Sequence, residues 1–172
     1  SYARDHSRSE CAPQTLDSVQ KRFLRNINLI SFEALHHINL APLSCRRDIA
    51  NLGIILRAVT KRGPHQLRSL FKLSGSSFRS SPRRPSHRFQ VIDATRVLCR
   101  NYLDRSTFRY VAVFNLLPEC VFHTEDDAVF PISVSSFQSN LTSLLKSASN
   151  HELEWEGLFL PRTIIFDHVL RR

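Results

Sequence analysis

The sequence contains no methionine and only four glycines and one tryptophan among its 172 residues. The missing methionine fits either loss of an initiator before Ser1 or a piece of a longer reading frame. With so little glycine a phosphate-cradling loop is not expected, and no GxSxG, GxGxxG or P-loop pattern occurs. These absences argue against the familiar nucleotide-binding loops and nucleophile elbows.

Long apolar runs and closely spaced cysteines are absent as well. No run approaches the roughly 20 apolar residues of a membrane span, and the polar N-terminus lacks the apolar stretch of a secretory signal. The cysteines lie far apart, without a CxxC pair, at Cys11, Cys45, Cys99 and Cys120. We therefore expect a reduced, intracellular protein of the nucleus or cytoplasm, with no membrane partner, rather than a disulfide scaffold.

The net charge of +9 is spread unevenly along the chain. Residues 1–110 hold 20 Lys/Arg and 7 Asp/Glu, a balance of +13, and residues 111–172 hold 4 and 8, a balance of −4, which together give +9. A basic half beside an acidic half indicates a polyanion partner for the first half and allows contact between the two. The alternative is a solvated basic face without a partner.

Apolar residues at helical spacing predict a mainly α fold, a small helical bundle with irregular termini. The first helix is expected from Thr15, with Asp17 in its first turn. Its apolar stripe, of a kind typical of a core-facing side, consists of Leu16, Val19, Phe23 and Ile27, with Gln20 and Leu24 beside it. A short second helix is expected after Ser31.

The segment NLAPLSCRRDIANLGIILRAVTKRG holds the strongest predicted helix. Pro42 or Ser44 can begin it, Gly63 is the expected C′ residue, and Pro64 fits the first turn of a further short helix. Its broad apolar stripe consists of Ile49, Leu52, Ile55, Leu56 and Val59. Gly53, in the helix interior, costs about 1 kcal/mol against alanine and indicates a close approach of another helix.

The C-terminal half is predicted to hold two further helices and one ambiguous segment. Residues 89–103 fit a short strand, Phe89–Ile92, followed by a helix. A helix with Ser106 or Thr107 as its cap should run until Pro118 ends it. Its expected face is Phe108, Val111, Ala112 and Asn115. The last helix should begin at Ser133, with Val134, Phe137, Leu141, Leu144 and Leu145 in phase.

Composition divides the chain into a loose segment, 1–14, a basic helical domain, 15–71, a linker, 72–88, and a mixed, mostly helical segment, 89–172. The linker includes SSFRSSPRRPSHR, which holds serine, arginine and proline, one aromatic residue and no acid. Such a run cannot bury enough apolar surface to offset its ordering entropy. By composition alone it is a solvated linker between two folded segments, and the alternative is that it binds a nucleic acid.

The candidate catalytic and metal-binding residues lack the partners that their chemistry requires. The consecutive acids Glu125, Asp126 and Asp127 have neither the hydrophobic hairpin nor the further aspartate of a polymerase site, and fit an acidic surface loop. Cys120 and His123 have the spacing of one ligand pair of a zinc site, but the sequence has no second close pair of Cys or His to complete it. The adjacent His36 and His37 point to different helix faces and are poor co-ligands. We therefore predict no catalytic residue, no metal and no cofactor, hence no enzyme.

Four stretches in order, LDSVQKRFLR, NLAPLSCRRDIANLG, RSTFRYVAVFNLLP and SVSSFQSNLTSLL, resemble the region downstream of the polymerase domain in non-LTR (LINE-type) retrotransposon proteins. In that family an LxxVQRRxLR helix follows the palm, a helix with paired arginines comes next, and a WNxLP element precedes an SxxxFxxxLxxxL helix. The resemblance covers about three quarters of the chain.

The chain departs from that family in ways that limit what the resemblance implies. Phe114 stands where tryptophan usually precedes Asn115, which keeps an aromatic ring but loses the indole donor. The palm with its catalytic aspartates, the cysteine–histidine knuckle and the endonuclease are missing. The resemblance therefore implies a non-catalytic tail, or a remnant, of an RNA-directed DNA polymerase that helps to hold template RNA and primer DNA.

The predicted nucleic-acid-binding residues are cations, because each phosphate that they neutralise releases counterions and arginine binds phosphate bidentately. They are Lys21, Arg22, Arg25, Arg46, Arg47, Arg79, Arg83, Arg84 and Arg88. Phe78 and Phe89 bracket the linker and are candidates to stack on bases, although core packing is the better expectation for both. The expected partners are RNA or DNA backbone and the polymerase domain of the parent. The alternative function is a structural or protein-interaction segment that packs on that missing domain.

Overall fold

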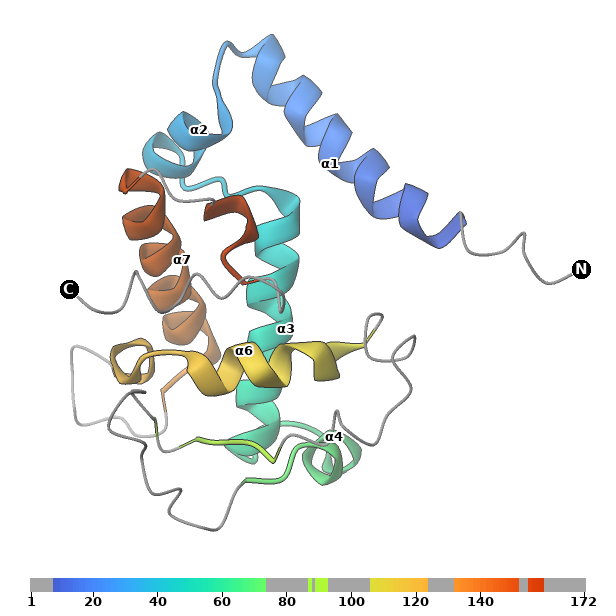
Figure 1. Ribbon diagram of the computed structural model, residues 1–172, viewed down its shortest axis with the longest axis vertical. Coiled ribbons are helices and arrows are strands. Elements are labelled where there is room, and N and C mark those ends of the chain that lie inside the picture. The colour runs from blue at the N-terminus through green and yellow to red at the C-terminus, as the bar shows by residue number, and fades with distance from the viewer. Residues whose placement is uncertain are drawn as a thin grey trace, which may run out of the picture.

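The fold is organised around α3 (Leu43–Val59), which lies against α1 (Arg8–Asn26), α4 (His65–Leu70), α6 (Tyr110–Leu116) and α7 (Val134–Asn150) in the computed structural model (Figure 1). Helix α2 (Ser31–His37) joins α1 to this group and also contacts α7. The structure describes residues 8–73, 87, 89–92, 106–123, 132–151 and 155–159, and the side chains from residue 16 on. Within these ranges the fold is mainly α, as predicted.

Short 3-10 turns complete the described fold, at η2 (Thr107–Arg109), η3 (Glu119–Phe122) and η4 (Trp155–Gly157). The extended segment expected at Phe89–Ile92 forms a single antiparallel bridge, between Leu73 and Val91, and is the sole β pairing among the described residues. The helix expected to follow it lies outside these residues. None of the helices in the described ranges is long and apolar enough to cross a membrane.

One hydrophobic core joins the two predicted segments 15–71 and 89–172. The predicted stripe of α3 is buried, and it packs in the same cluster as Phe114 of α6, Phe137 of α7 and Phe159 near the C-terminus. The face predicted for α6 differs from the observed one, because Ala112 is exposed while Tyr110, Val113 and Phe114 are buried. Both segments therefore depend on each other for burial of their apolar side chains.

The crossing of α3 and α7 explains Gly53. A Cβ atom at this position would lie 2.8 Å from Gln138 Nε2 and 3.3 Å from Val134 Cγ1. The close helix approach predicted from the glycine is confirmed. Ser133 is the N-cap of α7, and its hydroxyl accepts a hydrogen bond from Ser136 N at 3.0 Å, so the start of this helix also agrees with the prediction.

The end of α3 differs from the prediction. Lys61, with φ of 60°, occupies the left-handed C′ position that was expected for Gly63. Arg62 N donates to Arg57 O at 3.0 Å and Lys61 N donates to Ala58 O at 3.3 Å, which together form a Schellman motif. Sequence favoured the glycine because it carries no Cβ penalty, but the hydrogen bonds close the helix two residues earlier.

The C-terminal end of the predicted linker belongs to the core. His87 is buried, its Nδ1 accepts from Phe89 N at 3.2 Å, and its Nε2 lies 2.7 Å from Phe114 O. Because Nδ1 is an acceptor, Nε2 carries the proton and donates to the carbonyl. Asn115 fastens the same segment to α6, with Val91 N donating to its Oδ1 and its Nδ2 donating to Val91 O, both at 2.8 Å.

Candidate nucleic-acid interface

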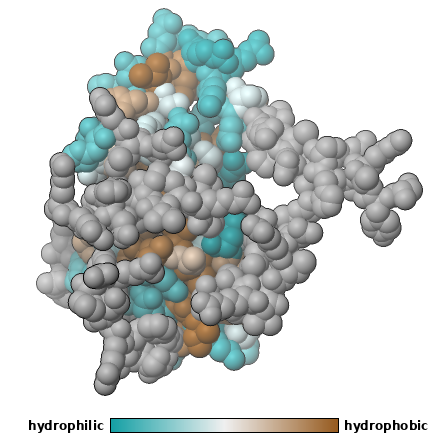
Figure 2. Space-filling view, viewed as in Figure 1, coloured by the Kyte–Doolittle hydropathy of each residue, from teal (hydrophilic) through white to brown (hydrophobic). Residues whose placement is uncertain are grey.

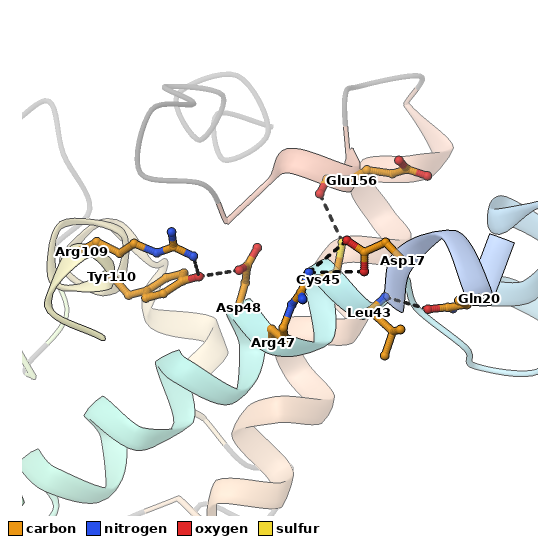
Figure 3. A network of polar contacts seen from close by, with 9 residues as sticks. All are labelled: Asp17, Gln20, Leu43, Cys45, Arg47, Asp48, Arg109, Tyr110 and Glu156. Atoms are coloured by element: carbon orange, nitrogen blue, oxygen red, sulfur yellow. Dashed lines mark hydrogen bonds and ion pairs between the residues drawn. The ribbon is translucent and has the colours of Figure 1, made fainter. Parts of the chain in front are cut away.

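Helix α1 is attached to the start of α3 by polar side chains as well as by packing (Figure 3). Gln20 Oε1 accepts from Leu43 N at 2.8 Å, and Gln20 Nε2 donates to Ala41 O at 3.2 Å. Asp17 pairs with Arg47 of α3 at 3.0 Å. Leu24, which is 3% exposed, supplies the buried apolar contact of this face.

The predicted apolar stripe of α1 does not face the core. Leu16, Val19 and Phe23 are 57%, 59% and 52% exposed, and Ile27 is exposed as well. At about 100° per residue, the inward residues Asp17, Gln20 and Leu24 form a face beside the stripe rather than on it. The expectation that these apolar residues pack inside was therefore wrong. Figure 1 shows that α1 extends away from the other helices.

The basic side chains of α1 form a further, outward face. Lys21, Arg22 and Arg25 are exposed, and their spacing places them on the side of the helix roughly opposite the apolar stripe. Arg25 Nε donates to the Lys21 backbone carbonyl at 3.4 Å, and both residues are exposed.

The paired arginines at the start of α3 have different roles. Arg46 is exposed and forms no ion pair with another described residue, whereas Arg47 Nη2 donates to both carboxylate oxygens of Asp17, at 3.0 and 3.3 Å. Arg47 therefore serves as a link between helices, and Arg46 is the member available to a phosphate. Between α1 and the start of α3 lies a cavity of about 60 Å³, lined in part by Gln20 and Pro42.

Several predicted contacts lie outside the described residues, namely Phe78, Arg79, Arg83, Arg84 and Arg88. Phe89, the other candidate for base stacking, is buried and packs on Phe122 with ring centroids 5.3 Å apart. The better expectation for this residue, core packing, is confirmed. Of the predicted contacts that the structure describes, Lys21, Arg22, Arg25 and Arg46 are exposed and form no ion pair with another described residue.

A buried polar network that was not predicted joins α3 to η2 and α6 (Figure 3). Tyr110 Oη donates to Asp48 Oδ1 at 2.5 Å and in turn contacts Arg109 Nη2. Asp48 is 4% exposed, and burial raises the pKa of its carboxyl group, an effect that the Tyr110 hydrogen bond opposes. A signal was present, because Asp48 lies in register with the buried residues Leu52 and Ile55 of α3.

Burial also suppresses the ionisation of other groups in this region. It raises the pKa of the Cys45 thiol to about 12, with the Asp48 charge acting in the same direction. The thiol donates to Glu156 O at 3.3 Å. Burial and the contact with Asp48 raise the pKa of Tyr110 to about 12. Cys45 is therefore a structural thiol and a poor nucleophile at neutral pH.

The remaining predicted candidates do not converge on a reactive site. His123 Nε2 lies 3.8 Å from Glu119 Oε1, and no group of three potential metal ligands occurs within the described ranges. His36 faces α7, where its Nε2 lies 2.9 Å from Ser149 Oγ, while His37 is exposed. The acids 125–127 lie outside the described residues.

Figure 2 shows hydrophilic and hydrophobic side chains side by side at the top of the visible face, and hydrophobic ones gathered near its centre and below it. No protein-family model, curated protein or solved structure matches the chain.

Proposed function

We propose that this chain binds the backbone of RNA or DNA without catalysing a reaction, through the basic face of α1 and Arg46. The observation that carries the proposal is the availability of these charges. Lys21, Arg22, Arg25 and Arg46 are exposed, and none of them forms an ion pair with another described residue. Unpaired cations can exchange their counterions for phosphates, with a gain in solvent and ion entropy.

The shape of the site favours contact with the backbone over recognition of bases. The cavity next to Gln20 holds about 60 Å³, whereas pockets for small organic ligands occupy about 300–1,000 Å³. The cations lie on the outside of helices, where a strand can pass along them. Phosphate contacts of this kind position a strand and carry little sequence information.

The resemblance to the C-terminal region of non-LTR retrotransposon polymerases supports the same function. Its stretches supply the interface and the core that holds it: VQKRFLR lies in α1, SCRRDIANLG in α3, FNLLP at the end of α6 and SSFQSNLTSLL in α7. Phe114, at the place of the family's tryptophan, is fully buried. In this proposal the chain is the tail, or a remnant, of such a polymerase.

The proposal is tested by fluorescence anisotropy with short single-stranded RNA, single-stranded DNA and an RNA–DNA hybrid across a salt series. We expect the affinity to fall steeply with salt, and Arg46→Glu to lower the slope of log K against log salt by about 0.7 on single strands. Lys146→Glu on α7 reverses one charge away from the interface and is the matched control. Absence of binding by the unaltered chain at low salt would overturn the proposal.

A second function, a segment that packs on the polymerase domain of the parent, has one observation in its favour. The stripe Leu16, Val19, Phe23 and Ile27 is an exposed apolar face on a helix that extends from the body. It is tested by light scattering and by binding to a palm fragment of a related polymerase. A monodisperse monomer that does not bind the fragment would contradict this function and would not affect the nucleic-acid proposal.

A further inference from the structure

A second basic site lies at the opposite end of α3, in a groove between that end and α4. The groove has a volume of about 420 Å³, within the usual range of about 300–1,000 Å³ for pockets that hold a small organic ligand. Among the described residues, its charged and titratable lining consists of Lys61, His65, Arg68 and Lys72, and none of the carboxylates in that part of the chain contributes to it. All four side chains are exposed.

The groove combines this cationic rim with an apolar floor. Its apolar lining consists of Ala58, Val59 and Phe71, which are buried, and of Leu73, which is 42% exposed and is the part that a ligand can cover. An inorganic anion would use the rim alone. A ligand that also has a flat, weakly polar body would cover the floor, and so gain from burial as well as from charge.

The backbone that carries the rim is fixed by the surrounding structure. Lys61 is held in the left-handed conformation by the Schellman motif that ends α3. Phe71 stacks on Phe108 with ring centroids 5.0 Å apart, and Lys72 O accepts from Ile92 N at 2.9 Å. Cations on an anchored backbone lose less entropy when they bind, which favours a defined site.

We propose that this groove binds one nucleotide unit of the nucleic-acid strand, with its phosphate on Arg68, Lys61 and Lys72 and its base over the apolar floor. The inference rests on the proposed function, because the ligand is the same strand. Helix α3 has 17 residues, so its two ends are about 25 Å apart. At about 3.4 Å per nucleotide of a stacked strand, about seven nucleotides connect Arg46 to the groove.

The experiment is an NMR titration of the ¹⁵N-labelled chain with a twelve-nucleotide thymidine strand, because it reports each site separately. We expect amide shifts in residues 61–73 as well as around Arg25 and Arg46. Arg68→Glu should abolish the groove shifts, keep those of α1 and lower the salt slope by about 0.7. Lys146→Glu is the control of equal charge change and should retain both sets.

Each outcome separates this inference from the function on which it rests. Shifts confined to α1 and the start of α3 would overturn the groove and leave the proposed function in place. Shifts at neither site would overturn both. Groove shifts that survive Arg68→Glu would overturn the contact assigned to Arg68. Groove shifts that Lys146→Glu removes equally would show an effect of net charge and would overturn the assigned contacts. The ¹⁵N spectrum of each variant also shows directly whether it has folded.

Discussion

Asp17 of α1 and Arg47 of α3 form an ion pair with 3.0 Å between Oδ2 and Nη2, which divides the basic surface into a structural and an available part. The side chains are 30% and 40% exposed, respectively. Pairs in such surroundings contribute about 0–1 kcal/mol to stability. The larger consequence is electrostatic, since the pair removes Arg47 from the set of free cations and places a carboxylate beside the others.

Asp17→Asn should therefore strengthen nucleic-acid binding while it costs little stability. The substitution removes the negative charge and frees Arg47 for a phosphate, so we expect a salt slope larger by about 0.7 on single strands. The free energy of unfolding should fall by less than about 1 kcal/mol. Anisotropy across a salt series and urea unfolding measure the two effects. Weaker binding by Asp17→Asn would contradict the assigned interface.

Tyr110→Phe should destabilise the fold through Asp48. The variant keeps the ring but removes the hydroxyl that donates to the buried carboxylate at 2.5 Å, and an unsatisfied buried acceptor costs about 1–3 kcal/mol. Because burial raises the folded-state pKa of Asp48, its ionisation opposes folding as the pH rises. Asp48→Asn should remove that part of the pH dependence. Urea unfolding at pH 4 and pH 7 measures both effects, with Asn51→Ala as a comparison on the same helix.

Much of this architecture follows from the sequence, because helix formation depends on local spacing and on caps. Ser133 as the N-cap of α7 and Gly53 at the helix crossing were both readable in this way. The pairing of Asp48 with Tyr110 was not, since the two lie 62 residues apart and neither has a local signal for the other. The linker arginines remain a prediction, because the structure does not describe them.

The orientation of α1 was the main error, and its cause is physical. Periodicity shows which residues share a face, but not which face meets the rest of the chain. In α1 the hydrogen bonds of Gln20 and the ion pair of Asp17 fix the contact side, and the apolar stripe is left outside. The polar contacts of Gln20 and Asp17 therefore decide which side of α1 packs against α3, although the neighbouring side of the helix is more apolar.

Neighbouring residues of α1 should consequently respond in opposite ways to truncation. Leu24→Ala should cost about 2–5 kcal/mol, because it empties a buried site. Phe23→Ser should stay within about 0.5 kcal/mol, because the ring is already in solvent. Thermal and urea unfolding of the two variants give the comparison. A large loss for Phe23→Ser would mean that the stripe is covered in solution.

His87 should make the fold sensitive to mild acid. Burial lowers the pKa of its imidazole to about 4, although the hydrogen bond to Phe114 O opposes this shift. The usual value is about 6.5, and the hydrogen bond that Nδ1 accepts from Phe89 N requires the neutral ring. A lowered folded-state pKa contributes stability that is present above pH 6.5 and is lost as the pH falls toward 4. The difference corresponds to about 3 kcal/mol. His87→Gln should lack this loss, so the gap in unfolding free energy between the two proteins should shrink with acidification.

Gly53→Ala has two opposing effects on stability, a gain in helix propensity and a steric clash where α3 crosses α7. Alanine gains about 1 kcal/mol in the helix interior, but its Cβ would lie 2.8 Å from Gln138 Nε2, the end of a flexible side chain. Removing that obstacle in Gln138→Ala should let Gly53→Ala stabilise the fold by about 1 kcal/mol, less any remaining overlap with Val134. Gly53→Leu cannot be accommodated in this way and should cost about 1–3 kcal/mol in either background. A double-mutant cycle in urea measures the coupling, and additivity of Gly53→Ala and Gln138→Ala would show that the two helices do not meet at this glycine.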